Sequence, residues 1–281
     1  MHLHSPSLRT SRGDSSQAFW RDPAMPFVES RRACDSRACY KPHHHPTYSI
    51  GVVDAGSSLF TGAADGPVAL GPGTMVFVPA ERVHACNPAT DTAWSYQMLH
   101  LDADWLRTVR QEYGQAGAME DDPVRIVTQS AAYRHFCQLN TLLFSDADPG
   151  DKESALIEFI GDCDTEDGLH IGVASAPSRL AKRIQPALER LRAAPADSIT
   201  LCELANLAGM GRYQLIRVFR TVTGMTPHAW LLNHRINLAK EWIRDGKDFS
   251  DVAHHLGFAD QAHFQRVFKA HAGVTPGRFR A

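Results

Sequence analysis

The sequence predicts an α+β protein with two domains, in which a β-barrel or sandwich precedes an all-α domain. Short β-rich runs alternate with turn residues between Phe27 and Leu101, and no helical pattern interrupts them. The C-terminal third shows apolar residues at helical spacing and carries one motif twice. A chain of 281 residues has room for two such cores.

The N-terminal region is predicted to be an arm followed by a small barrel. Residues 1–18 are rich in Ser, His and Arg, which predicts a disordered arm. The strand candidates that follow are separated by clusters of Gly, Pro, Asp and Asn. They are PFVESRRA, TYSIGVV, SSLFTG, TMVFVPA and WSYQMLHL.

A helical hairpin is predicted to complete this first domain, which we place at residues 19–163. Apolar residues take helical spacing from Gln129 to Cys163, with a break at residues 148–150. The apolar face of the hairpin is expected either to pack on the barrel or to pair with a second copy of the chain. Residues 164–177 are predicted to be a linker, because they contain two glycines and a proline.

The second domain, residues 178–281, contains the same motif from Glu203 and again from Asp251. Each copy predicts a short helix, a turn at a glycine and a second helix with a buried apolar stripe, which is the layout of a helix-turn-helix. Each copy ends with Gly, a spacer, Thr and Pro, which stop one helix and begin the next. The polar face of each second helix is left free for a partner.

This region, from Arg179 to Ala281, resembles the DNA-binding domain of the AraC/XylS family of bacterial transcription regulators. The resemblance is carried by GFADQAHFQRVFKAHAGVTPGRFR and RINLAKEWI. It implies two recognition helices in successive major grooves of DNA, joined by a helix over residues 227–244. We expect Arg235, in that helix, to pack between the two units.

DNA contacts are predicted on the exposed faces of the two recognition helices. The resemblance places base-reading positions at Tyr213, Ile216 and Arg217, and at Gln261, His263, Gln265 and Arg266. Ile216 departs from the polar residue common there and offers apolar contact to a thymine methyl. The two arginines are alternatively phosphate-binding. The predicted DNA-binding residues are Arg212, Tyr213, Gln214, Ile216, Arg217, Gln261, His263, Gln265 and Arg266.

The distribution of charge supports a polyanionic partner for the second domain. The whole chain has a net charge of −2, but from Ser178 onward 16 Lys and Arg stand against 8 Asp and Glu. The preceding residues hold 13 basic and 23 acidic side chains. The second domain therefore has the electrostatic character of a DNA-binding domain.

Two segments of the first domain are similar to cupin motifs. They are GPGTMVFVPAERVHACNP, which contains His84, and the His-x-His formed by His43 and His45. The resemblance implies the cupin-like barrel with which AraC-type regulators bind effectors. In metal-binding cupins such histidines and a glutamate hold a divalent ion, but no glutamate follows His45 here.

The histidines leave two kinds of site open. His43, His45 and His84 are predicted either to hold zinc or iron with an open position, or to line an organic pocket. Tyr48, Trp94 and Tyr96 are expected to form an apolar wall. The predicted effector-binding residues are His43, His45, Tyr48, His84, Trp94, Tyr96 and His100.

The function predicted from these features is sequence-specific regulation of transcription under the control of a small effector. Resemblance favours an activator that touches RNA polymerase, an effector related to amino acids, and a homodimer. The alternatives are a regulator that senses metal or redox state, or a metal-dependent cupin enzyme, which lacks its glutamate; we therefore expect no enzymatic activity. With no apolar run of membrane-spanning length and no signal region, a soluble, cytoplasmic protein is expected.

Overall fold

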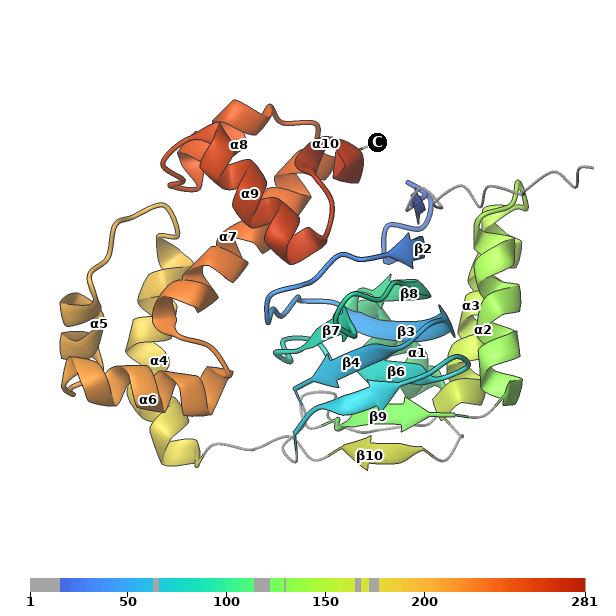
Figure 1. Ribbon diagram of the computed structural model, residues 1–281, viewed down its shortest axis with the longest axis horizontal. Helices are drawn as coiled ribbons and strands as arrows, with labels where there is room; N and C mark the ends of the chain where they lie inside the picture. Colours follow the sequence, from blue (N-terminus) through green and yellow to red (C-terminus); the bar gives the residue numbers. More distant parts are fainter. Residues whose placement is uncertain are drawn as a thin grey trace, which may run out of the picture.

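The computed structural model describes residues 16–62, 66–113, 122–128, 130–164, 168–171 and 177–280. A β-rich domain lies beside a helical domain, and the helix hairpin of the β-rich domain stands on the side away from its helical neighbour (Figure 1). The two-domain α+β prediction is therefore confirmed.

Two antiparallel sheets form the β-rich domain. The three-stranded sheet has the order β5 (Val68–Leu70), β4 (Ser58–Thr61) and β7 (Ala85–Pro88). The larger sheet has seven strands, in the order β1 (Ser16–Trp20), β2 (Val28–Ser36), β8 (Trp94–Leu101), β3 (Tyr48–Ala55), β6 (Met75–Val78), β9 (Val124–Val127) and β10 (Leu169–Ile171).

Residues of the larger sheet alternate between two environments, because successive side chains of a strand point to opposite faces. One face packs on α1 (Ala103–Glu112), α2 (Ser130–Leu143) and α3 (Pro149–Asp164), where Phe136 and Phe159 are fully buried. The other face meets the smaller sheet around Phe60 and Trp94. The predicted hairpin, α2 and α3, thus packs on the barrel.

Two boundaries differ from the sequence prediction. Ser16–Trp20, placed partly in the disordered arm, forms β1 and pairs with β2 over five residues. Leu169–Ile171, placed in the linker, forms β10 and pairs with β9. Both strands are short edge strands, whose pairing partners supply more order than their own composition indicates. Residues 1–15 lie outside the described residues.

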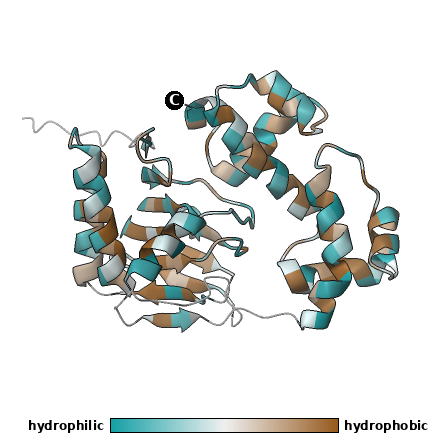
Figure 2. Cartoon of the chain, turned by 180° about the vertical axis from the view of Figure 1, so that it is seen from behind, coloured by the Kyte–Doolittle hydropathy of each residue, from teal (hydrophilic) through white to brown (hydrophobic). Residues whose placement is uncertain are grey.

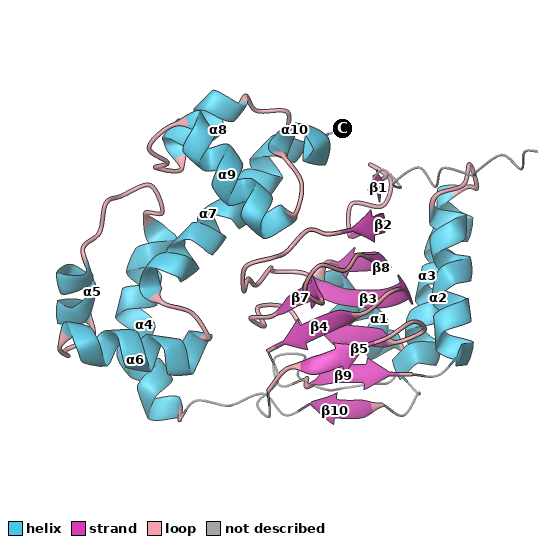
Figure 3. Cartoon of the chain, in the orientation of Figure 1, coloured by secondary structure: helices cyan, strands magenta, loops and turns pink. Residues whose placement is uncertain are grey.

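The helical domain holds two helix-turn-helix units joined by one long helix, as predicted (Figure 3). The glycines that end α6 and α9, Gly224 and Gly273, have φ of 75° and 73°, the left-handed conformation expected of a helix stop. The helices are α4 (Ser178–Ala193), α5 (Leu201–Leu207), α6 (Arg212–Thr223), α7 (Pro227–Arg244), α8 (Phe249–His255), α9 (Gln261–Ala272) and α10 (Pro276–Arg280).

Each unit has its own apolar core, and most helices show both a hydrophobic and a hydrophilic side (Figure 2). Phe219 of α6 and Phe268 of α9 are fully buried at equivalent positions. Within the described ranges, every helix is too short or too polar to cross a membrane.

Candidate functional site

The outer faces of α6 and α9 carry the predicted DNA-contacting side chains. Tyr213 is 75% exposed, and the Arg217 guanidinium lies 5.9 Å from the centre of its ring. Ile216 is half-buried. The remaining predicted residues that are exposed are Arg212, Gln214, Arg217, Gln261, Gln265 and Arg266.

His263 lies differently from the other candidates. Its ring is half-buried against Phe258, with ring centroids 5.6 Å apart, and the Asp260 carboxylate caps the helix by accepting from the His263 backbone N–H. The imidazole is thus partly engaged in packing at the start of α9.

Arg235 joins the two units from within α7. Its side chain is buried, and its guanidinium donates to the carbonyl oxygens of Pro195 (2.6 Å) and Gly257 (2.7 Å). The expectation that Arg235 packs between the units is confirmed. Charged donors in contact with loop carbonyls on both sides fix the relative positions of the units.

A cavity of about 120 Å³ lies where the barrel meets the helical domain. Both domains line it. From the predicted effector-binding set, the structure brings six residues together there: His43, His45, His84, Trp94, Tyr96 and His100.

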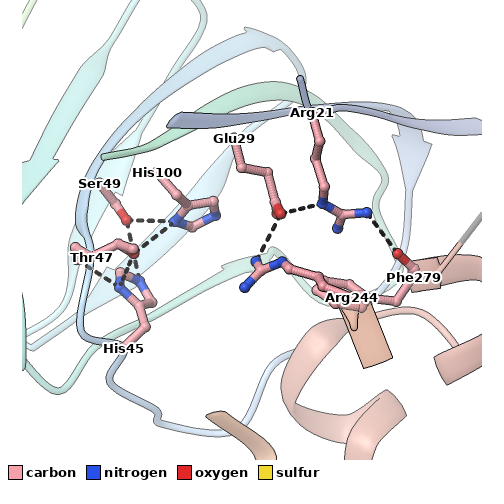
Figure 4. Close-up of polar contacts among 8 residues, drawn as sticks. All are labelled: Arg21, Glu29, His45, Thr47, Ser49, His100, Arg244 and Phe279. Atoms are coloured by element: carbon pink, nitrogen blue, oxygen red, sulfur yellow. Dashed lines mark hydrogen bonds and ion pairs between the residues drawn. The ribbon is translucent and has the colours of Figure 1, made fainter. Parts of the chain in front are cut away.

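Tyr48 does not line this cavity, and its placement in the predicted site is wrong. Its side chain is buried in the core beside α1, where the Arg110 guanidinium lies 5.0 Å from the ring centre. The next residue, Ser49, has the opposite orientation because side chains alternate along β3. The Ser49 hydroxyl lies 2.8 Å from Nδ1 of His100 (Figure 4).

The three clustered histidines are held by main-chain contacts outside the regular strands. His43 and His84 form an isolated antiparallel bridge, with backbone N–H to carbonyl distances of 3.0 and 2.9 Å. Nδ1 of His43 lies 2.8 Å from the carbonyl of Lys41, and Nδ1 of His84 lies 2.8 Å from that of Arg82. Nδ1 must carry the proton to donate to these oxygens, so each Nε2 bears a lone pair.

His45 completes the cluster in the same way, because its Nδ1 lies 2.9 Å from the carbonyl of Thr47. Burial lowers the pKa of His84 to about 4 and that of His100 to about 3. Burial also holds the pKa of His45 well below its ordinary value. The rings are therefore neutral near pH 7.

Comparison with known proteins gives the family. Residues 28–160 match the AraC-like ligand binding domain, and residues 204–281 match a helix-turn-helix domain. The chain belongs to the AraC family of transcription regulators. It is a DNA-binding regulator with a ligand-binding domain.

The chain is similar to several known proteins. The HTH-type regulator YbfI of Bacillus subtilis, itself uncharacterised, is 23% identical over 86% of this chain and 87% of its own length. The transcriptional activator RclR of Escherichia coli is 32% identical over 45% of this chain and 43% of its own. ToxT of Vibrio cholerae has a TM-score of 0.56 at 10% identity, covering 95% of this chain and 98% of ToxT, which shows a shared fold.

The helical domain supplies cavity residues that sequence reasoning missed. They come from α7, α9 and α10, and only the packing of the two domains brings them to the barrel. No local pattern could have shown this, because Lys240 and Arg244 lie in an ordinary helical run. The missed residues are Asn237, Lys240, Glu241, Arg244, His271, Ala272 and Phe279, with Phe19, Glu29, Arg31 and Tyr40 from the barrel.

Glu29 and Arg244, which line the cavity, form an ion cluster with Arg21 (Figure 4). Glu29 of β2 pairs with Arg21 and, at 2.8 Å, with Arg244 of α7. Burial alone would raise the pKa of Glu29, but the two guanidiniums bring it down to about 2. Glu29 is therefore ionised and ties the barrel to α7.

Lys240 of α7 faces the same cavity. The structure gives its ammonium no hydrogen-bond or ion-pair partner within the described ranges, and burial, with nearby Arg244, lowers its pKa to about 8. Its charge also lowers the pKa of His43, His45 and His84. The lysine thus lies close to the histidine cluster.

The histidine cluster suits zinc or iron in donor type, with a looser spacing than that around a bound ion. One nitrogen from each of His43, His45 and His84 lies within 4.8 Å of the others. Tetrahedral zinc with Zn–N of about 2.0–2.1 Å needs nitrogens roughly 3.4 Å apart. A bound metal would therefore require the three rings to move closer together.

Redox sensing through the cavity cysteine is disfavoured by its surroundings. Burial raises the pKa of the Cys86 thiol to about 12. The thiolate is the reactive form, so this cysteine is a poor sensor. Cys34 and Cys39 are exposed and do not line the cavity.

Proposed function

We propose that this regulator is a cytoplasmic transcription activator in which a small effector bound in the cavity changes how α9 is presented to DNA. One observation carries the proposal: side chains of the barrel and of α7 and α9 line the same cavity. A molecule bound there contacts both domains, so its affinity depends on how they are docked. Effector binding and DNA binding are then thermodynamically coupled.

The docking contacts give this coupling a physical path. Arg31 of β2 donates to the carbonyl of Ala272 at the end of α9, at 3.0 Å. The main-chain N–H of Lys41 donates to the carbonyl of Ala270, at 3.1 Å. Arg31 lines the cavity, and the Lys41 carbonyl lies 2.8 Å from Nδ1 of His43, so a change in the cavity reaches the second recognition helix directly.

Likeness to other proteins supports the finer parts of the proposal. ToxT, which shares the fold, has been solved with an unsaturated fatty acid bound. RclR is described as an activator, which supports activation through RNA polymerase. We expect the effector here to be an amino acid or derivative, and a homodimer to form through α2 and α3. Analytical ultracentrifugation and transcription with purified RNA polymerase test the last two points.

The central test is the dependence of DNA affinity on the domain interface. A duplex site is selected from a random library with the full chain, and its Kd is measured for Arg244→Met, which removes the ion pair with Glu29. We expect a severalfold change in Kd, because docking of the helical domain on the barrel is weakened. Lys182→Met on the exposed side of α4 removes one positive charge and is the control. Equal Kd shifts in the two variants would contradict control through the interface.

A further inference from the structure

One wall of the cavity presents hydrogen-bond acceptors. The Nδ1 atoms of His43, His45 and His84 are engaged with main-chain carbonyls, which leaves each Nε2 as a hydrogen-bond acceptor, and one nitrogen of each ring lies within 4.8 Å of the others. The Ser49 hydroxyl has a single proton and lies closer to His100 (2.8 Å) than to Nε2 of His45 (3.3 Å). A ligand group that donates several hydrogen bonds would therefore be complementary to this wall.

The rest of the cavity presents donors and positive charge. The Lys240 ammonium makes no hydrogen bond or ion pair with the residues that the structure describes. Within the same part of the chain, the buried Nε of Arg31 and the indole N–H of Trp94 lack acceptors. All three residues line the cavity. Buried donors without acceptors cost free energy, so this side calls for an anionic group.

We propose that the effector is a small amino acid, with its ammonium group bound by the imidazoles of His43, His45 and His84 and its carboxylate bound by Lys240 and Arg31. This inference rests on the proposed function and names the ligand of the same cavity. The ligand would join the histidines of the barrel to α7, and through Arg31 to the end of α9.

The upper limit on the spacing of the histidine nitrogens leaves room for an ammonium group among them. Three acceptors at about 2.9 Å from a tetrahedral nitrogen are roughly 4.7 Å from one another. The observed nitrogens lie within 4.8 Å of one another. An ammonium group also has three donors, one for each lone pair, whereas a fatty acid has none to offer this wall.

The dimensions of the cavity limit the side chain of the ligand. Its volume of about 120 Å³ is well below the roughly 300–1,000 Å³ of pockets for drug-sized ligands. Trp94 and Tyr96, stacked with ring centroids 4.2 Å apart, line it beside Phe19. A small apolar or hydroxylated side chain suits this wall.

Calorimetry with the full chain tests the assignment. The protein is purified without an affinity tag, dialysed against a chelator, and titrated with each of the twenty L-amino acids. Each ligand that binds is compared with two analogues, the acid that lacks the amino group and the methyl ester that lacks the carboxylate charge. We expect each analogue to bind roughly tenfold or more weakly, because each loses charge-assisted hydrogen bonds.

Two variants assign the two ends of the ligand. Lys240→Met should weaken binding roughly tenfold and reduce the preference for the acid over its ester. His43→Leu, at a half-buried position, should instead reduce the preference for the amino acid over its deaminated analogue. Lys182→Met is the charge-matched control, and thermal melts of each variant report its folding.

The outcomes distinguish a wrong ligand class from a wrong proposed function. A deaminated acid that binds as tightly as the amino acid, with no effect of His43→Leu, would overturn the amino acid assignment. Stoichiometric Zn²⁺ binding that His43→Leu abolishes would overturn it in favour of a metal. In both cases control by the cavity stands if Lys240→Met still alters the response of DNA affinity to the bound molecule. If no amino acid or zinc binds and Arg244→Met leaves DNA affinity unchanged, both proposals fail.

Discussion

The two helix-turn-helix units have nearly the same sequence motif but different relations to the barrel. The second unit, residues 248–273, is held by two hydrogen bonds to carbonyls at the end of α9, one from the Arg31 guanidinium and one from the main-chain N–H of Lys41. The first unit, residues 200–224, meets the barrel mainly through apolar contact with Val83. A repeated motif has thus acquired one docked copy and one freer copy.

The glycines that end α6 and α9 show how this difference arises. A Cβ on Gly273 would lie 2.4 Å from the Tyr40 hydroxyl oxygen, whereas a Cβ on Gly224 would lie 3.1 Å from a side-chain carbon of Val83. Both glycines stop their helices, but only the second also allows close approach of a polar barrel residue. Control by an effector is therefore expected to act first on the second unit.

The largest effects are expected from removing the central ring of each unit. Phe219→Ala and Phe268→Ala should each lower the free energy of unfolding by about 3–5 kcal/mol, because both rings are fully buried. Phe268→Ala should also loosen docking, since its ring contacts that of Phe279, whose carbonyl accepts from Arg21. Urea unfolding measures the first effect, and hydrogen exchange in β1 and β2 the second. Unchanged exchange in Phe268→Ala would show that docking does not depend on this core.

DNA recognition should also differ between the units. We expect Arg266→Ala to weaken binding by about 1–3 kcal/mol and to relax preference at one base position. Arg217→Ala should reduce base preference less. The first unit is expected to be less specific to begin with, because Ile216, beside Arg217, makes only apolar contact with a base. Fluorescence anisotropy on a selected site and its single-base variants measures both. A uniform loss on all sequences would identify either arginine as a phosphate contact.

Acid should destabilise the docked side of the molecule. His100 has a pKa of about 3 in the folded state, against 6.5 ordinarily, because burial, with Lys240, Arg31 and Arg244, outweighs Glu29. As pH falls, His100 is therefore protonated in the unfolded chain before it is protonated in the folded one. The contribution of neutral His100 to the free energy of unfolding is complete above pH 6.5 and is lost as pH falls toward 3. Between pH 7 and 5 this amounts to about 2 kcal/mol.

Urea unfolding at the two pH values measures this loss of stability. His100→Gln keeps a polar side chain but removes the titrating group. The loss of unfolding free energy between pH 7 and 5 should therefore be smaller in this variant by about 2 kcal/mol. A variant that keeps the full pH dependence would show that other groups are responsible for it.

The sequence predicted the helical domain well because its signals are local. The bounds of α7 and the left-handed stops at Gly224 and Gly273 follow from spacing, capping residues and glycine alone. Five of the strands were also predicted, as alternating runs between turns. The short strands β1, β5, β7, β9 and β10 were missed, because three to five residues carry little pattern of their own.

Local sequence patterns predicted only part of the cavity. His43, His45 and His84 could be predicted to meet because their motifs resemble a known barrel. Tyr48 was misplaced because the sequence does not show which face of β3 each residue takes. Successive residues point to opposite faces, so an error of one residue exchanges Tyr48 and Ser49. The contributions of α7 and α9 depend on docking of two domains, which no single segment encodes.

The smallest effect is expected at the start of α5, where the units differ in capping. Thr200 and Glu203 form a capping box in the first unit, whereas Asp248 at the start of α8 accepts from Ser250 N without the reciprocal bond. Thr200→Ala should lower the free energy of unfolding by about 1 kcal/mol, and Thr200→Ser, which keeps the hydroxyl, by much less. Urea unfolding of the two variants measures the difference. Among the described residues, the first unit has no main-chain hydrogen bond to the barrel, so its local capping is expected to contribute more to its stability. Thr200→Ala should therefore lower the free energy of unfolding more than Asp248→Ala does, and a larger loss in Asp248→Ala would contradict this account of the two copies.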